Sequence, residues 1–375
     1  MLNESRAVRW TWLAVLALSI VQAGAYIGNE TSAHYFWDLT SYVEALDSEF
    51  PYRAQRTYPF LYPPFAADLF TLARSHLFEL MSIAYVAAIV LFLTAYARLK
   101  MPRRFEWLLA MTAMGGLGVV SLQSGNLAIP MNLTLLAVTM RAAMGDAAAA
   151  RAMPFVIGFG ALLKPQFIVY LGLLPFLERS RLMAFVKMAV VAACVAAVYG
   201  GYVAFRFDDW NEYVRAITQR AVVEKDYAWG PAGFIKHWSE STAAATAAFA
   251  IALIAVAALA YAAWRHSALV PPVAVACLVF VVLTFANPRL PVYDIYVAGI
   301  ALVVCCGFAN RKVLPVTLLI ALSVNVIPWT IANFTRTPSA WPWWMQTLQF
   351  AHIIGFGGLL VALAFTGMHQ SPPEP

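Results

Sequence analysis

Long runs of apolar residues, separated by short polar or Pro/Gly-rich breaks, occupy most of this 375-residue chain. A helix that spans a membrane needs about 20 apolar residues, and many of the runs approach that length. The runs are Trp10–Ile27, Phe78–Ala97, Trp107–Leu122, Leu127–Met140, Pro154–Leu177, Leu182–Phe205, Ala243–Trp264, Leu269–Phe285, Val292–Phe308, Val313–Ile331 and Thr347–Phe365. They predict an all-α polytopic membrane protein.

One of these runs, Pro154–Leu177, is interrupted by Lys164-Pro165-Gln166. Proline ends or kinks a helix at the preceding residue. The arm Pro154–Leu163 would be about 15 Å long, which is half of the hydrocarbon core. We therefore expect two short helices that meet at Lys164 and return to the same side. This hairpin raises the expected total to about 12 membrane helices, with both termini on one face.

The charges favour one orientation of this bundle. Only 12% of the residues are charged and 62% are hydrophobic, whereas soluble proteins carry roughly 25% charged residues, so soluble classes are excluded. With both termini in the cytoplasm, the inner face has 14 Lys and Arg against five Asp and Glu, a net charge of +9. The outer face has a net charge of −3. This difference obeys the positive-inside rule and accounts for the overall charge of +6 without a nucleic-acid partner.

The expected organisation is a single transmembrane domain, 1–375, with two long outer loops at 28–77 and 206–242. Pro63-Pro64 predicts a short surface helix over Phe65–Leu72 in the first loop, because proline suits the first turn of a helix. The N-terminal run could alternatively be a cleavable signal peptide. Because both long loops and most carboxylates fall outside, we expect any chemistry on the outer face of a cell inner membrane.

Metal and cofactor chemistry finds no support in the sequence. Four cysteines lie inside apolar runs, where they are expected to be small buried hydrophobic residues: Cys194, Cys277, Cys305 and Cys306. The six histidines show no metal-ligand spacing, and no nucleotide-binding loop is present. We expect no metal and no cofactor.

Three charged residues are the strongest candidates for chemistry. Asp38 follows an aromatic run in the first outer loop and could be a general base, a solvated residue or a helix N-cap. Lys164 interrupts an apolar run, where an ionisable group is costly, yet it could also extend from a helix end to the interface. Arg289 precedes Tyr293-Asp294 and could bind phosphate or form a structural pair with the aspartate.

Further hydrogen-bonding side chains fall at the same outer ends of the expected spans. The combined set comprises Asp38, Tyr62, Gln123, Asn126, Lys164, Gln166, Arg289 and Asp294. One base, two cations and several hydrogen-bonding groups facing lipid suit attack by an acceptor hydroxyl on a sugar whose leaving group is a lipid phosphate.

The order of short motifs resembles a known family. Asp38-Leu39-x-x-Tyr42 comes first, then Tyr62-Pro63-Pro64, a Gln123/Gly125/Asn126 turn, Lys164-Pro165-Gln166, and a late Asn287-Pro288-Arg289…Tyr293-Asp294 turn. Between about residues 10 and 310 this series resembles glycosyltransferase family 87, the polyprenyl-phosphate-mannose-dependent mannosyltransferases of the GT-C superfamily. Many members carry a Trp/His-rich segment where this chain has Tyr293-Asp294, so no histidine is assigned a role.

The resemblance implies a GT-C-type bundle and transfer of mannose on the periplasmic face, with the catalytic aspartate at Asp38. A single displacement with this base would invert the anomeric carbon. The donor would be a polyprenyl-phosphate sugar, and the acceptor a hydroxyl of a lipid or glycan. Lys164 and Arg289 would bind the donor phosphate, and we expect neutral variants of either to fold. The remaining candidates are substrate-binding: Tyr42, Tyr58, Tyr62, Gln123, Asn126, Gln166, Tyr293 and Asp294. A twelve-span transporter or lipid flippase is the alternative, although no internal repeat supports it.

Overall fold

The computed structural model describes residues 37–48, 51–52, 60–99, 101, 109, 124–178, 180–220, 241–265, 271–287 and 292–308. These residues form helices and contain no strand. Except for Leu109, four expected spans lie outside the described residues: Trp10–Ile27, Trp107–Leu122, Val313–Ile331 and Thr347–Phe365. The all-helical class is therefore confirmed for the part of the chain that is described.

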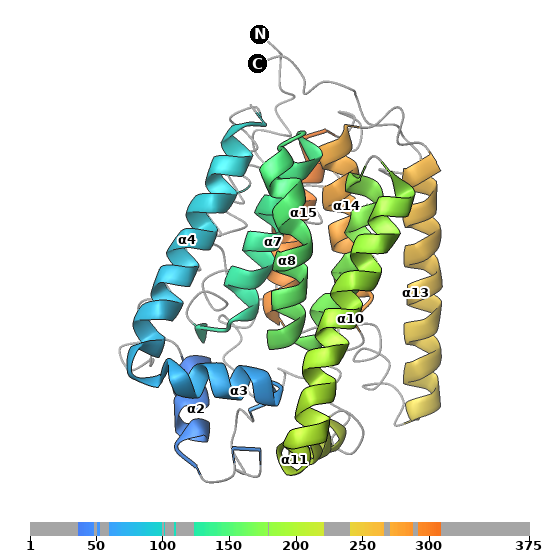
Figure 1. The fold of residues 1–375 in the computed structure, drawn as a ribbon. Coiled ribbons are helices and arrows are strands. Elements are labelled where there is room, and N and C mark those ends of the chain that lie inside the picture. The colour runs from blue at the N-terminus through green and yellow to red at the C-terminus, as the bar shows by residue number, and fades with distance from the viewer. Residues whose placement is uncertain are drawn as a thin grey trace, which may run out of the picture.

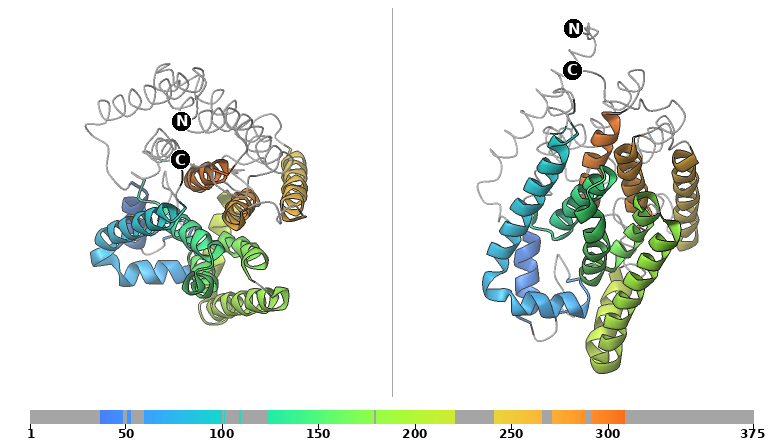
Figure 2. Two further views of the ribbon diagram at one scale, coloured as in Figure 1. Left: turned by 90° about the horizontal axis from the view of Figure 1, so that it is seen from above. Right: turned by 45° about the horizontal axis from the view of Figure 1, so that its top comes forward.

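Most of the long helices lie side by side in one bundle (Figure 1). They are α4 (Leu77–Ala97), α7 (Ala128–Ala143), α8 (Ala147–Leu163), α10 (Arg181–Phe205), α13 (Thr242–Arg265), α14 (Pro272–Phe285) and α15 (Val292–Cys306). Figure 2, seen along the bundle, places α13 at the edge of this set. Apart from the start of α8, the observed bounds agree with the expected apolar runs to within a few residues.

Helix α4 is apolar on every side. Met81, Tyr85 and Phe92 are buried against the bundle, while Ile83 and Val90 on the opposite face are more than half exposed. A helix that is hydrophobic all round is either enclosed by protein or surrounded by lipid. The exposed face of α4 thus has the composition of a lipid-facing surface.

Helix α10 shows the same property more strongly. Only Ala184 and Val195 are buried among its 25 residues. With the short 3-10 helix η1 (Arg74–His76) joined to α4, two described stretches are long and apolar enough to cross a membrane, Arg74–Ala97 and Arg181–Phe205.

The cysteines agree only in part with the expectation that they are buried. Cys277 and Cys305 are buried as expected, whereas Cys194 on α10 is exposed, so the expectation for Cys194 was wrong.

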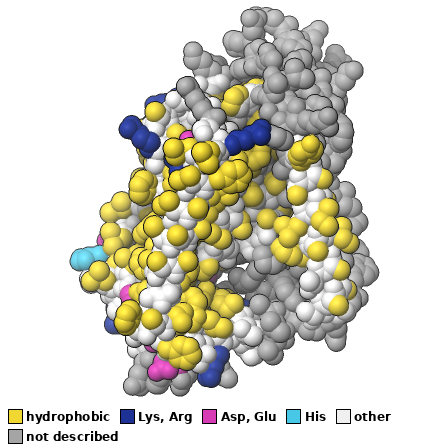
Figure 3. Space-filling view, turned by 45° about the vertical axis from the view of Figure 1, so that its right-hand side comes forward, with side chains coloured by type: hydrophobic (Ala, Val, Ile, Leu, Met, Phe, Trp, Pro, Cys, Tyr) yellow, Lys and Arg dark blue, Asp and Glu magenta, His cyan; other side chains and the backbone are white. Residues whose placement is uncertain are grey.

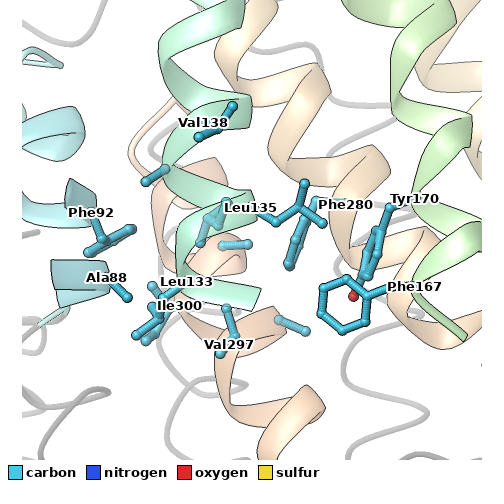
Figure 4. Packing of buried hydrophobic residues seen from close by; sticks show 14 of the residues in the cluster. Ala88, Phe92, Leu133, Leu135, Val138, Phe167, Tyr170, Phe280, Val297 and Ile300 are labelled. Atoms are coloured by element: carbon cyan, nitrogen blue, oxygen red, sulfur yellow. The ribbon is translucent and has the colours of Figure 1, made fainter. Parts of the chain in front are cut away.

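The centre of the bundle is built from α7, α14 and α15. Nearly all of α14 is buried, and the inward side chains of α7 and α15 fill the space beside it. Figure 4 shows Leu133, Leu135, Val297 and Ile300 gathered between these helices and the α4 side chains Ala88 and Phe92. This packing fixes α7, which carries Asn132, and the turn just before the helix carries Asn126; these asparagines belong to the two polar clusters described below.

The helix break at Lys164 occurs where the proline predicts it. Helix α8 ends at Leu163, Lys164 adopts an extended backbone, and Pro165 begins the 3-10 helix η2 (Pro165–Leu173), followed by α9 (Leu174–Leu177). The expected start at Pro154 was wrong, because α8 begins at Ala147 and contains Pro154. Four consecutive alanines and an N-cap explain the longer arm, which is about 25 Å.

The two arms approach closely beside the break. A Cβ added to Gly160 would lie 2.7 Å from the ring of Phe167, a residue of η2 that is itself buried. A glycine at this position therefore lets η2 pack directly against α8. The contact places Lys164 at the end of a closely packed hairpin.

Asp146 caps α8 at the opposite end of the bundle. Its Oδ1 accepts hydrogen bonds from the backbone of Ala148 and Ala149, and its Oδ2 accepts from Arg141 at 2.6 Å and Arg98 at 3.3 Å. Gly145, with φ of +86°, allows the tight reversal from α7. The Arg141 hydrogen bond, followed by the backbone donor of Ala149, lowers the pKa of Asp146 to about 2.

Asp146→Asn should lower the thermal unfolding temperature at pH 7, because asparagine keeps the cap but loses the pairing with Arg141. A carboxyl whose pKa is lower in the folded state stabilises above its unfolded pKa, near about 4, and loses that contribution as the pH falls toward 2. The gap between variant and wild type should therefore narrow below pH 4 in thermal melts. A gap that does not change with pH would contradict the assignment.

The expected first outer loop forms helices at the other end of the bundle. Helix α2 (Trp37–Leu46) is followed by α3 (Pro64–Leu72), which begins at the proline as predicted and lies across the end of the bundle in Figure 1. Helix α11 (Phe207–Thr218) lies at this same end, in the expected second outer loop. Arg206 joins these segments through an ion pair with Asp68 of α3.

Candidate functional site

Asp38 lies in the first turn of α2 and is only 4% exposed. Its Oδ2 accepts a hydrogen bond of 2.8 Å from Nδ2 of Asn126. A carboxylate at this depth is retained when polar groups satisfy it, and the side-chain amide of Asn126 is one of them. The alternative of a solvated loop residue was therefore wrong.

The turn that carries Asn126 is fixed by its own backbone. Gly125 has φ of 67°, a conformation that glycine adopts without strain. The amide N–H of Asn126 donates to Oγ of Ser124, and Oδ1 of Asn126 accepts from the backbone of Ala128 at the start of α7. Tyr85 donates to the Asn126 carbonyl at 2.8 Å. The amide group that faces Asp38 is thus held from several directions.

Two tyrosines extend the Asp38 cluster. Asn126 Nδ2 also donates to the hydroxyl of Tyr42 at 3.0 Å, and that hydroxyl lies 3.0 Å from the hydroxyl of Tyr62. Burial, then the neighbouring Tyr62 and Asp38, raises the pKa of Tyr42 well above its usual value. The phenol therefore stays neutral and can donate a hydrogen bond near the carboxylate. The rings of Tyr42 and Tyr62 pack with Phe60 and Phe70.

A second polar cluster surrounds Lys164. Its Nζ lies 3.1 Å from Oδ1 and 3.0 Å from Oδ2 of Asp294, the acidic residue in the first turn of α15. The lysine side chain is 13% exposed and the aspartate side chain 4%. The residue that could have paired with Asp294 in the sequence interpretation, Arg289, lies outside the described residues. In the structure, the ion-pair partner of Asp294 is Lys164.

Asn132 and Tyr170 complete this second cluster. Nδ2 of Asn132 donates to Oδ1 of Asp294 at 2.7 Å, and Tyr170 donates to Oδ1 of Asn132 at 3.1 Å. The Tyr170 hydroxyl also lies 3.0 Å from Oγ1 of Thr284, and its ring stacks on Phe280, as Figure 4 shows. Sequence reasoning missed Asn132, Tyr170 and Thr284. The isolated amide of Asn132 within an apolar run was the signal that could have found them.

The two clusters belong to one end of the bundle. Asn126 lies in the turn that leads into α7, and Asn132 lies in the second turn of that helix. Tyr293, the neighbour of Asp294, is close enough to Tyr42 to contribute to its raised pKa. The site therefore combines a buried carboxylate, a neutral phenol and a lysine that is already paired with an acid.

The remaining predicted site residues fall into two groups. Gln166 and Tyr293 are half-buried beside Lys164 and Asp294 in the sequence. Tyr58, Gln123 and Arg289 lie outside the described residues. Their roles stay predictions.

Within the described part of the chain, no group of three or more His, Cys, Asp and Glu side chains could hold a metal ion.

No protein-family model, curated protein or solved structure matches the chain. Functional inference therefore depends on the residues themselves and on the geometry of the two clusters.

Proposed function

We propose that this protein is a membrane glycosyltransferase that moves a sugar, mannose by the family resemblance, from a polyprenyl-phosphate donor to an acceptor hydroxyl. The single observation that carries the proposal is the buried Asp38 carboxylate, oriented by Asn126 at the same end of the bundle as Lys164. A base and a cation on one face of an apolar bundle are the groups that this reaction requires.

In the proposed reaction the acceptor hydroxyl attacks the anomeric carbon of the sugar. Asp38 accepts the hydroxyl proton as the new carbon–oxygen bond forms, and the bond from the anomeric carbon to the phosphate oxygen breaks. The leaving polyprenyl phosphate keeps the electron pair. Lys164, together with Arg289, stabilises the growing negative charge on that phosphate. A single displacement inverts the anomeric carbon, so a β-linked donor gives an α-linked product.

The proposed location is a cell inner membrane, with about 12 spans in a GT-C-type arrangement, both termini cytoplasmic and the site on the outer face. Figure 3 supports it, because hydrophobic side chains cover the middle of the visible described surface and charged side chains gather toward its ends. The two long apolar helices, α4 and α10, contribute much of this exposed apolar surface.

The direct test uses purified protein in detergent with synthetic farnesyl-phosphoryl-β-mannose and lipids extracted from the expression host as acceptors. Isotope-labelled mannose should move to a product with an α linkage, which nuclear magnetic resonance can assign. Absence of transfer from this donor, from a protein that remains folded and monodisperse, would contradict the proposal.

The topology makes a second prediction. In a Cys194→Ala background, a cysteine at Ser48 should react with a charged thiol reagent added outside intact cells, and a cysteine at Ala148 should not. Ala148 is an exposed position in the first turn of α8 and avoids the positive φ of Gly145, where a cysteine would be strained. Labelling of Ala148→Cys from outside would overturn the orientation.

A further inference from the structure

Asp294 binds the lysine in the same way as a phosphate group would. Both carboxylate oxygens lie within 3.1 Å of Nζ of Lys164. A phosphate also presents two or more anionic oxygens to an ammonium group. The carboxylate and an incoming phosphate would therefore compete for the same cation.

The two partners differ in their freedom to move. Lys164 is the more exposed side chain, at 13% against 4% for Asp294, and it lies at the break between α8 and η2. Its four-carbon stem allows the ammonium group to change direction. Asp294 is held in the first turn of a buried helix and cannot follow it.

Asp294 keeps another donor if Lys164 turns away. Asn132 donates to Oδ1 of Asp294 at 2.7 Å, and Tyr170 orients the Asn132 amide by donating to its oxygen. A buried carboxylate without any donor would be costly, so this hydrogen bond lowers the cost of opening the ion pair.

We propose that Asp294 is an internal competitor for the phosphate-binding lysine. The Lys164–Asp294 pair opens when a phosphate group arrives and re-forms when that group leaves, which speeds release of a phosphate-bearing product. The inference rests on the proposed function, which supplies the identity of the ligand. That ligand is a phosphate group, either carried by a lipid as an ester or free in solution.

The test measures binding of farnesyl phosphate and of inorganic phosphate to the full-length protein in detergent, with farnesol as the phosphate-free probe. Asp294→Asn should bind farnesyl phosphate roughly tenfold more tightly, because a competing charge-assisted contact is lost. Asn132→Leu should bind it more weakly, because opening the pair then leaves Asp294 with one donor fewer. Farnesol binding should not change in either variant.

The double variant Lys164→Met/Asp294→Asn should lose the gain of Asp294→Asn, since the cation that benefits is absent. Tyr199→Phe is a matched control, because the Tyr199 hydroxyl donates to a carbonyl of α8 and not to the Asp294 cluster. If Asp294→Asn does not fold, Tyr170→Phe keeps the aromatic ring and should weaken farnesyl phosphate binding by releasing Asn132.

Unchanged binding in Asp294→Asn, or no phosphate-dependent binding by any protein, would overturn the proposal. A gain for both phosphate probes indicates that the headgroup alone is recognised, and a gain for farnesyl phosphate alone indicates recognition of a lipid-borne phosphate. These results do not depend on transfer. If Asp294→Asn binds farnesyl phosphate more tightly but the wild type transfers no sugar, the proposed function is overturned and this inference stands. If the wild type transfers sugar but Asp294→Asn binds farnesyl phosphate as the wild type does, the proposed function stands and this inference is overturned.

Discussion

Replacing Asp38 with asparagine should reduce glycosyl transfer by roughly 10²–10⁴-fold, the usual contribution of a general base. A sugar hydroxyl is a weak nucleophile at neutral pH and must lose its proton as it attacks. Asparagine has almost the same size as aspartate, and its oxygen can still accept the hydrogen bond from Asn126. The variant should therefore fold and bind donor but turn over very slowly.

The measurement is product formation from synthetic donor by purified wild type and Asp38→Asn, together with farnesyl phosphate binding and a thermal melt for each. Glu44→Gln is the matched control, because Glu44 is an exposed acid on the same short helix and should not matter. Turnover by Asp38→Asn at the wild-type rate would remove Asp38 from the mechanism. Asp294 would then be the next acid to test as the base.

The helices were predictable because they depend on local patterns. The break at Lys164 follows from Pro165, and the start of α3 follows from Pro64. The start of α8 was misplaced because Pro154 was interpreted as a helix start. The N-cap Asp146, eight positions before Pro154 and followed by four alanines, was the stronger signal, since Asp146 satisfies two backbone donors.

The partners within the site were less predictable because they are distant in sequence. Asp38 and Asn126 were both candidates, yet nothing local indicates that residues 88 positions apart are hydrogen-bonded. Lys164 and Asp294 are separated by 130 positions, and the sequence instead offered Arg289 as a neighbour for Asp294. Tertiary packing brings these side chains together, and for Lys164 and Asp294 it is the packing of α8 and α15 against α7.

This pairing changes what is expected when Lys164 is neutralised. Lys164→Met should destabilise the protein by about 3–5 kcal/mol, because it leaves the buried carboxylate of Asp294 without its cation. Sequence reasoning expected such a variant to fold normally. The structure makes its stability the first property to measure, before any loss of activity is attributed to phosphate binding.

The double variant Lys164→Met/Asp294→Asn should recover much of the stability lost in Lys164→Met, since no unpaired charge remains. Thermal unfolding of the single and double variants in one detergent measures the coupling energy between the two residues. Lys187→Met is the matched control, because Lys187 of α10 pairs with Glu178, the residue after α9, in a more exposed setting than the Lys164–Asp294 pair. Its removal should cost about 1 kcal/mol or less. Equal losses for Lys164→Met and Lys187→Met, with no recovery in the double variant, would show that the Lys164–Asp294 pair is energetically no different from a surface contact.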